Sequence, residues 1–172
     1  MNEPVLQGEL ERMHPESFSW ALWCCNYRRE EAEEVLQTTY LKILEGAAKF
    51  DGRSSQRTWL FAVIRRTAQE RRRRQWLRGH LFDRWQAIQP EPPSAPDPEG
   101  AASEAESSRA LLLALGELST RQREILHLVF YRDMTVEEAA SVLSISLGTA
   151  RTHFERGKRQ LRKMLDSSGV QP

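Results

Sequence analysis

Cysteine and histidine are scarce in this chain of 172 residues. The two cysteines, Cys24 and Cys25, are neighbours, so they cannot link distant elements, and the four histidines are scattered along the chain. Without Cys/His groups at metal-ligand spacing, a zinc site or a disulfide framework is excluded. We therefore expect no metal, no cofactor and a reducing, cytoplasmic environment.

Long apolar runs are also missing. No stretch approaches the roughly 18 to 20 apolar residues that span a bilayer, and the N-terminus has no secretory signal pattern, so we expect no membrane insertion. A catalytic constellation is missing as well. The acidic residues cluster at one helix start without partners for metal or acid–base chemistry, which argues against an enzyme.

Strand periodicity is nearly absent, and apolar residues recur at helical spacing instead. The apolar stripes comprise Ala32, Val35, Leu36, Tyr40, Ile43 and Ala47; Leu60, Val63, Ile64 and Thr67; and Ile125, Leu126, Val129 and Phe130. Residues 18–25 are apolar on nearly every side, which predicts a buried central helix. The predicted fold class is therefore all-α.

Charge is strongly segregated although the net charge is only +1. Residues 53–78 contain nine arginines and a single acid, Glu70, whereas residues 147–163 contain six basic residues and a single acid, Glu155. Local fields decide where a polyanion docks, so both segments are candidate nucleic-acid surfaces.

A proline-rich acidic stretch separates these two basic segments. Five of the eight prolines fall within residues 90–98, and residues 91–106 contain five acids and no Lys or Arg. This composition predicts a flexible acidic linker over residues 89–108. It would divide the chain into two small helical domains, residues 1–88 and 109–172.

The C-terminal domain has the pattern of a helix-turn-helix. Ser119 with Gln122 and Thr135 with Glu138 fit the capping box, and Ser146 is a further N-cap. The caps predict helices over about 120–131, 136–143 and 147–163.

The last of these helices has basic and polar side chains, as expected of a helix that enters the DNA major groove. Its first N–H groups could hold a phosphate, while arginine or histidine could contact guanine. A solvated basic face is the alternative. The candidate duplex-binding residues are Ser146, Gly148, Thr149, Arg151, Thr152, His153, Glu155, Arg156, Lys158 and Arg159.

The N-terminal domain has four acids, between residues 30 and 34, in the first turns of an amphipathic helix. Taken alone, this is typical of a solvated helix start, where carboxylates complement the helix dipole. As a functional feature, it would be an acidic docking face for a basic partner.

A second N-terminal feature is an aromatic helix start that runs into a dense arginine cluster. Aromatic rings stack on unpaired bases and arginines neutralise phosphates, and the polar loop 50–57 before the helix could accept a splayed base. Trp59 could equally belong to the core. The candidate residues are Phe50, Arg53, Ser55, Arg57, Trp59, Arg65, Arg66, Arg71, Arg72, Arg73 and Arg74.

Taken together, these motifs resemble the extracytoplasmic-function (ECF, group 4) sigma factors of bacterial RNA polymerase, in the sigma-70 family. The run from Glu31-Ala32-Glu33-Glu34 to Tyr40-Leu41 is similar to the acidic helix of region 2, and Trp59-Leu60-Phe61 with the arginine cluster follows in the same region. Residues 118–153 are similar to region 4. Ser144 stands at the family's turn glycine, where a left-handed backbone is expected.

The resemblance implies an alternative sigma factor with core RNA polymerase and promoter DNA as partners and an anti-sigma factor as regulator. The acidic helix would dock on the clamp helices of the largest subunit through Glu31, Glu33, Glu34, Gln37, Tyr40 and Leu41. Loop 50–57 would capture an unstacked −10 base, and the arginine helix would hold the adjacent backbone. Helix 147–158 would bind the −35 element, region 4 would meet the polymerase flap, and the linker would thread toward the active-site cleft.

Two other classes are compatible with parts of the sequence. A LuxR-type helix-turn-helix regulator would share the C-terminal pattern, but it would need an N-terminal sensor with strands. A nucleic-acid-processing enzyme would need the catalytic constellation that is missing.

Overall fold

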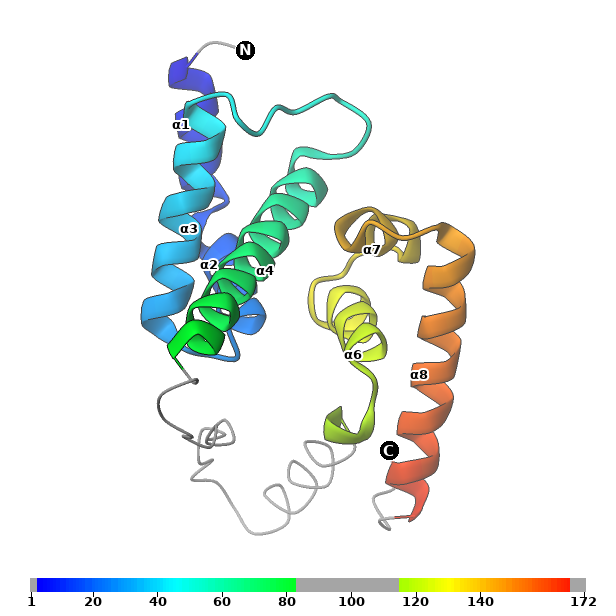
Figure 1. Cartoon of the computed structure of the whole chain (residues 1–172). Helices are drawn as coiled ribbons and strands as arrows, with labels where there is room; N and C mark the ends of the chain where they lie inside the picture. Colours follow the sequence, from blue (N-terminus) through cyan, green and yellow to red (C-terminus); the bar gives the residue numbers. More distant parts are fainter. Residues whose placement is uncertain (1–2, 83–114, 168–172) are drawn as a thin grey trace, which may run out of the picture. The chain divides into compact units, whose positions relative to one another are not determined.

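The computed structural model describes residues 3–82 and 115–167, and all regular structure in these ranges is helical, as predicted (Figure 1). The described residues fall into two compact units, one on each side of the gap. The predicted linker and both of its boundaries lie outside the described residues, so the placement of the linker stays a prediction.

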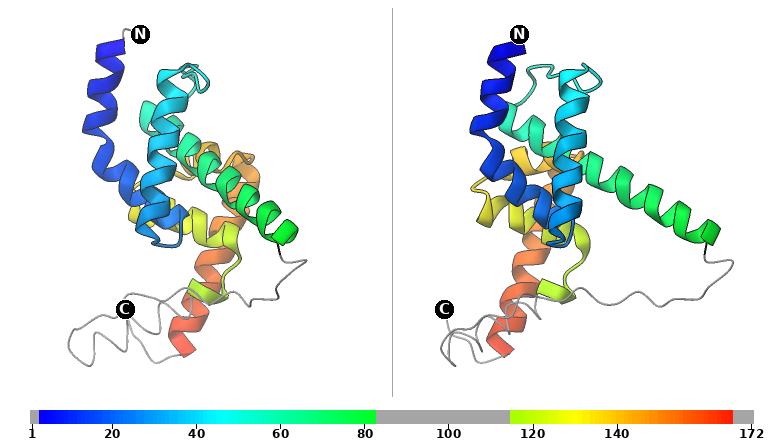
Figure 2. Two further views of the ribbon diagram at one scale, coloured as in Figure 1. Left: turned by 60° about the vertical axis from the view of Figure 1, so that its left-hand side comes forward. Right: turned by 90° about the vertical axis from the view of Figure 1, so that its left-hand side faces the viewer.

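The first unit consists of α1 (Glu3–Arg12), α2 (His14–Cys24), α3 (Arg29–Leu44) and α4 (Gln56–Phe82). Helices α2, α3 and α4 pack against one another, and the far end of α4 extends beyond them (Figure 2). The predicted stripes are confirmed for most members. The buried ones are Ala32, Val35, Leu36, Ile43, Leu60, Ile64 and Thr67. Tyr40 and Val63 are half-buried, whereas Ala47 is exposed.

Trp20 is the centre of this core. It is fully buried, and its indole Nε1 donates a hydrogen bond to the Phe61 carbonyl at 3.0 Å. Its ring stacks on both Trp23 and Phe61, with centroids 5.1 and 5.7 Å away. Because its polar atom is satisfied and its faces are covered, Trp20 fixes how α2 meets α4. The helix predicted at residues 18–25 is present, but only one side of it is buried: Phe18, Leu22 and Trp23 are half-buried.

Two connections position the long helices. Between α2 and α3, Asn26 and Tyr27 have positive φ, which turns the chain sharply. Before α4, the loop contains Gly46 and Gly52, whose φ values of +72° and +74° favour glycine. Ser55 then caps α4, because its Oγ accepts from the Thr58 N–H at 3.1 Å.

The second unit consists of α6 (Thr120–Leu126), η1 (His127–Tyr131), α7 (Val136–Leu143) and α8 (Leu147–Ser167). Both predicted capping boxes are present, at Ser119 and Thr135, and the Ser146 Oγ accepts from the Thr149 N–H at 3.1 Å. Ser144 has the expected left-handed backbone, with φ of +54°. A Cβ at Gly157 would lie 3.1 Å from Leu126, so α8 can approach α6 this closely because no side chain intervenes.

The predicted helix 120–131 differs from the structure in its second half. Residues 127–131 form a π-helix, whose wider turn shifts the helical phase. Leu128 is therefore buried, whereas Phe130, predicted to belong to the apolar stripe, is 62% exposed. The assignment of Phe130 to the core was wrong for this reason.

Neither a membrane-crossing helix nor a potential metal site is found within the described ranges. No helix among residues 3–82 and 115–167 has the length and apolar character that crossing a bilayer requires. No group of three or more His, Cys, Asp or Glu side chains in those ranges could hold a metal ion.

Candidate nucleic-acid interface

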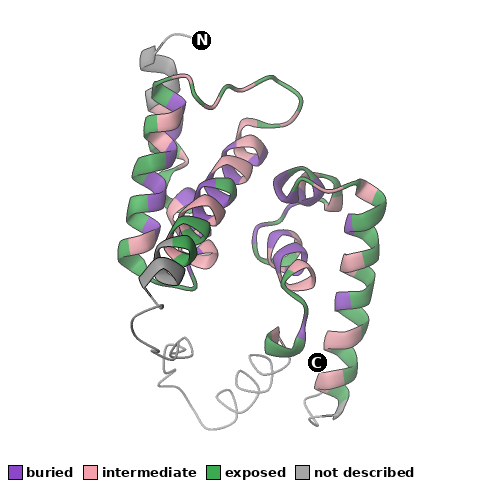
Figure 3. Cartoon of the chain, viewed as in Figure 1, coloured by how far each residue is buried: buried purple, intermediate pink, exposed green. Residues whose placement is uncertain are grey.

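The acidic start of α3 is part of an exposed helix face. Glu33, Glu34 and Gln37 are exposed, and Leu41 joins them one turn further along with 56% of its surface exposed. Exposed positions alternate along α3 with the buried ones that face the core (Figure 3). The exposed face thus combines two carboxylates, one amide and one large apolar side chain.

Two of the residues predicted for this face are less accessible. The Glu31 side chain is 17% exposed, and its carboxylate pairs with Arg28 at 2.7 Å. Tyr40 is half-buried, and its hydroxyl lies 3.2 Å from His14 Nδ1. Burial raises the pKa of Tyr40. Both residues therefore border the exposed face.

The loop before α4 brings two predicted aromatic residues together. The rings of Phe50 and Trp59 are 5.5 Å apart and tilted, and both residues are half-buried. Trp59 is therefore neither plain core nor fully exposed. Ser55, predicted to contact DNA, has its hydroxyl engaged in the N-cap, where it also donates to Thr58 Oγ1 at 2.9 Å.

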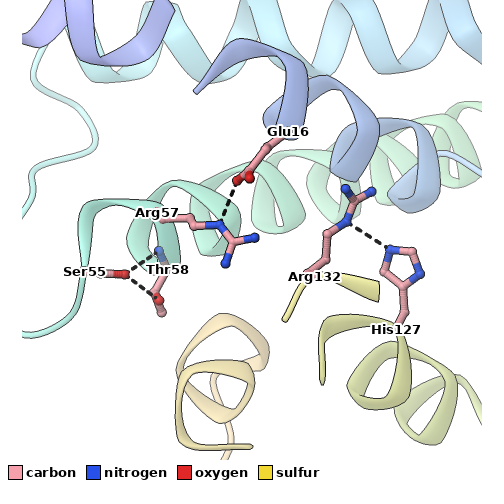
Figure 4. A network of polar contacts seen from close by, with 6 residues as sticks. All are labelled: Glu16, Ser55, Arg57, Thr58, His127 and Arg132. Carbon is pink, nitrogen blue, oxygen red and sulfur yellow. Dashed lines mark hydrogen bonds and ion pairs between the residues drawn. The ribbon is translucent and has the colours of Figure 1, made fainter. Parts of the chain in front are cut away.

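The two arginines of this segment differ in how they are held. Arg57 pairs with Glu16 of α2 at 2.7 Å, and its guanidinium covers the Phe61 ring (Figure 4). Arg53 is exposed on the loop and pairs with Asp51 at 3.4 Å. Arg57 thus anchors the start of α4 to α2, whereas the Arg53 side chain is exposed on the loop before α4.

The arginines of α4 do not share one environment. Arg66 and the run 72–74 are exposed, as expected of residues that contact phosphates. Arg65 is buried, and Gln69 Oε1 accepts from its guanidinium at 2.8 Å when that amide is turned toward it. Burial removes Arg65 from the surface, so the structure does not support its prediction as a DNA contact.

A charged groove between α3 and α4 was not anticipated from the sequence. Lys42 Nζ lies 2.6 Å from the Glu70 carboxylate and 3.4 Å from Thr67 Oγ1. The residues that line the groove are Glu34, Val35, Thr38, Lys42, Thr67, Glu70, Arg71 and Arg74. Lys42 follows Glu34 and Thr38 at four-residue spacing, which places the three on one face of α3. The partner of Lys42, Glu70, belongs to α4, so the spacing could not predict it.

In the second unit, α8 presents its predicted residues on one side. Arg151, Thr152, Glu155 and Arg156 are exposed, whereas Ala150 is buried on the inward side. Thr149, Lys158 and Arg159 are also exposed, and His153 is half-buried. Helix α7, the turn and α8 form the predicted helix-turn-helix, a motif whose second helix enters a DNA groove.

A buried polar pair supports the π-helix next to this motif. Arg132 Nε donates to His127 Nε2 at 3.3 Å (Figure 4). Burial and the Arg132 charge lower the pKa of His127 to about 3, so the imidazole is neutral. Beside it, Tyr131 is 72% exposed. The scattered histidines in the sequence gave no signal for this contact.

Family models match each of the two units. The model for sigma-70 region 2 covers residues 10–78, and the model for sigma-70 region 4 covers residues 114–163. These are the domains of a sigma factor of RNA polymerase, and neither model describes an enzyme family.

Similar proteins identify a subgroup within the sigma-70 family. The chain is 30% identical over 142 residues to the ECF RNA polymerase sigma factor SigX of Bacillus subtilis, covering 80% of this chain and 72% of SigX. It is 30% identical over 135 residues to the ECF RNA polymerase sigma factor SigK of Mycolicibacterium vanbaalenii, covering 78% of this chain and 68% of SigK. The chain belongs to the ECF sigma factors of the sigma-70 family, and the LuxR-type alternative is not favoured.

Solved structures share the fold. The sigma factor RpoE of Bartonella quintana, in complex with the anti-sigma factor NepR, is 23% identical with a TM-score of 0.66, covering 94% of this chain and 97% of RpoE. CnrH, in complex with the cytosolic domain of CnrY, is 22% identical with a TM-score of 0.60, covering 96% of this chain and 90% of CnrH.

Proposed function

We propose that this sigma factor binds core RNA polymerase through α3, holds the melted −10 element with the 50–57 loop and α4, and binds the −35 element with α8. The observation that carries the proposal is the exposed acidic face of α3 beside an exposed arginine run on α4 in one domain, with a helix-turn-helix in the other.

The polymerase contact would be made by the exposed face of α3. Glu33, Glu34 and Gln37 would meet basic side chains of the clamp helices, with Leu41 as an apolar anchor among them. Glu31 and Tyr40 would contribute from its edge. We propose further that region 4 meets the polymerase flap.

The −10 contact would combine stacking with phosphate neutralisation. The Phe50–Trp59 pair would receive an unstacked base, and captured bases would offset an unstacking cost of a few kcal/mol. The exposed arginines of α4 would hold the adjacent backbone. These are Arg66, Arg72, Arg73 and Arg74.

The −35 contact would place α8 in the major groove. Its exposed Arg151 and Arg156 can reach guanine acceptors, and Lys158 and Arg159, within the turn after Arg156, would hold the backbone. The capped N-terminus of α8 offers N–H groups to a phosphate.

We further propose that a linker at residues 89–108 joins the two domains. We also propose that the protein itself catalyses no reaction. Acting with bacterial RNA polymerase, it would work in the cytoplasm. Because RpoE and CnrH are bound by NepR and CnrY, an anti-sigma factor that covers the DNA- and polymerase-binding faces is the proposed regulator.

Co-elution of the full chain with bacterial core RNA polymerase tests the polymerase contact. We expect the parent chain to bind and Glu33→Lys/Glu34→Lys to lose binding, because the reversed charges would face basic clamp residues. Glu11→Lys/Glu45→Lys is the matched control, since both glutamates are exposed elsewhere in the same unit. Equal loss in both variants, or no binding by the parent, would refute the α3 contact.

A further inference from the structure

Arg71 differs from the three arginines that follow it. Its side chain is 25% exposed and turns toward α3, where Nη1 pairs with Glu34 and Nε lies 4.0 Å from Glu31. Arg72, Arg73 and Arg74 are exposed and make no ion pair with any described side chain. One arginine of the cluster is therefore already held by carboxylates.

Those carboxylates belong to the acidic face of α3. Glu34 is exposed on that face, and Glu31 lies at its edge. Glu33 is different, because it pairs within its own helix with Arg29 at 2.9 Å. The acidic face thus contains Glu33, which is independent of α4, and Glu34, which pairs with α4, while the close partner of Glu31 is Arg28 at 2.7 Å.

A guanidinium that is held by a carboxylate is a poor phosphate ligand, because a phosphate must displace that carboxylate. Equally, a carboxylate that is held by Arg71 is less available to a basic partner. The two surfaces therefore compete for the same ion pair, and a binding event at either surface affects the other by the same factor.

We propose that Arg71 couples polymerase docking to DNA binding: in the free chain Glu34 holds it, and basic clamp residues draw this carboxylate away and leave Arg71 to the promoter backbone. The inference rests on the proposed function, in which α3 docks on polymerase. It makes the free sigma factor a weaker DNA binder than the polymerase-bound one.

The exchange needs only side-chain movement. Helices α3 and α4 are held together independently by the pair of Lys42 and Glu70 at 2.6 Å and by the buried side chains of Val35 and Ile64. The Arg71 pair lies at the border of this contact, where a partly exposed ion pair is weak enough to exchange.

Binding of the free full-length chain to a fluorescent single-stranded DNA 20-mer tests the DNA side. We expect Glu34→Gln to bind about three-fold more tightly, because Arg71 is released. The slope of log K against log salt should steepen by about 0.7, the value for one added phosphate contact. Glu33→Gln removes the same charge from the neighbouring position without involving Arg71, and should stay near the parent.

Repeating the substitution in an Arg71→Gln background isolates the ion pair. There the gain should vanish, since no guanidinium remains to be released. An equal gain in the Glu33 control, a gain that persists without Arg71, or no gain at all would each overturn the coupling.

Affinity for core RNA polymerase tests the reciprocal side. Arg71→Gln should bind about three-fold more tightly than the parent, because Glu34 becomes available, whereas Arg72→Gln should not. If the parent does not bind core polymerase, the proposed function fails. If the parent binds and Arg71→Gln binds no better than Arg72→Gln, only the coupling fails.

Discussion

The two basic helices, α4 and α8, have similar charge but different surroundings. On α4, Arg65 is buried and Arg71 is held by carboxylates of α3, whereas on α8 Arg151 and Arg156 are exposed. The difference follows from what lies alongside. Helix α4 packs against an acidic helix, whereas α8 packs through small residues such as Ala150 and Gly157. Basic composition indicates a nucleic-acid surface, but neighbouring helices determine which arginines are exposed and can contact nucleic acid.

The largest expected effect is a loss of stability that is confined to the first unit. Trp20→Ala removes a fully buried ring and its hydrogen bond, which should destabilise the first unit by about 3–5 kcal/mol. Hydrogen exchange should show lost protection in α2, α3 and α4 and unchanged protection in α6 and α8. Trp76→Ala, at a residue that is largely exposed, is the control. Parallel loss in both units would contradict independent cores.

A pH effect should be confined to the second unit. The pKa of His127 is lowered to about 3 from the ordinary 6.5. Between these values the unfolded chain binds a proton that the folded chain does not, so stability falls as pH falls through this window. From pH 7 to pH 5 the loss should be up to about 2 kcal/mol.

Hydrogen exchange of α6 amides at pH 7 and 5 measures this effect. His127→Gln should remove the pH-dependent part while leaving any constant destabilisation. The same pH dependence in parent and variant would show that folding does not lower the pKa of His127.

A smaller effect should follow from the caps of the helix-turn-helix. Thr135→Ala removes the side chain that accepts from the Glu138 N–H at 3.1 Å, which should destabilise the second unit by about 1 kcal/mol. Thr135→Ser keeps the acceptor and should stay near the parent in urea unfolding. If the two variants lose the same stability, the hydroxyl is not the cause.

The smallest effect concerns a thiol of the first unit. Burial, with a contribution from Glu31, raises the pKa of Cys25 to about 11, so the reactive thiolate is scarce at pH 8. Reaction of the folded chain with a thiol reagent should therefore be slower at Cys25 than at the half-buried Cys24. Mass spectrometry of the modified peptides distinguishes the two, and preferential labelling of Cys25 would contradict its burial.

The sequence predicted the features that depend on near neighbours. The capping boxes at Ser119 and Thr135 and the left-handed Ser144 are local, because each side chain or backbone angle acts within one turn. The apolar stripe of α3 identified Val35 and Ile43 as core for the same reason. The family resemblance, which depends on ordered motifs, is confirmed as well.

The remaining features depend on contacts between distant residues. A run of arginines has no apolar marker that distinguishes Arg65, which is buried, from Arg66, which is exposed. The pair of Lys42 and Glu70 and the Arg71 contacts require the crossing of α3 and α4. The π-helix, which exposes Phe130, likewise departs from the ordinary helical period.

The most direct test of the central claim is to map the 5′ ends of transcripts that core RNA polymerase makes from genomic DNA with and without this protein. The account predicts start sites that require the protein and share two upstream elements at fixed spacing, one for α8 and one for the 50–57 loop with α4. Transcripts that do not depend on the protein, or dependent starts that share a single element only, would contradict it.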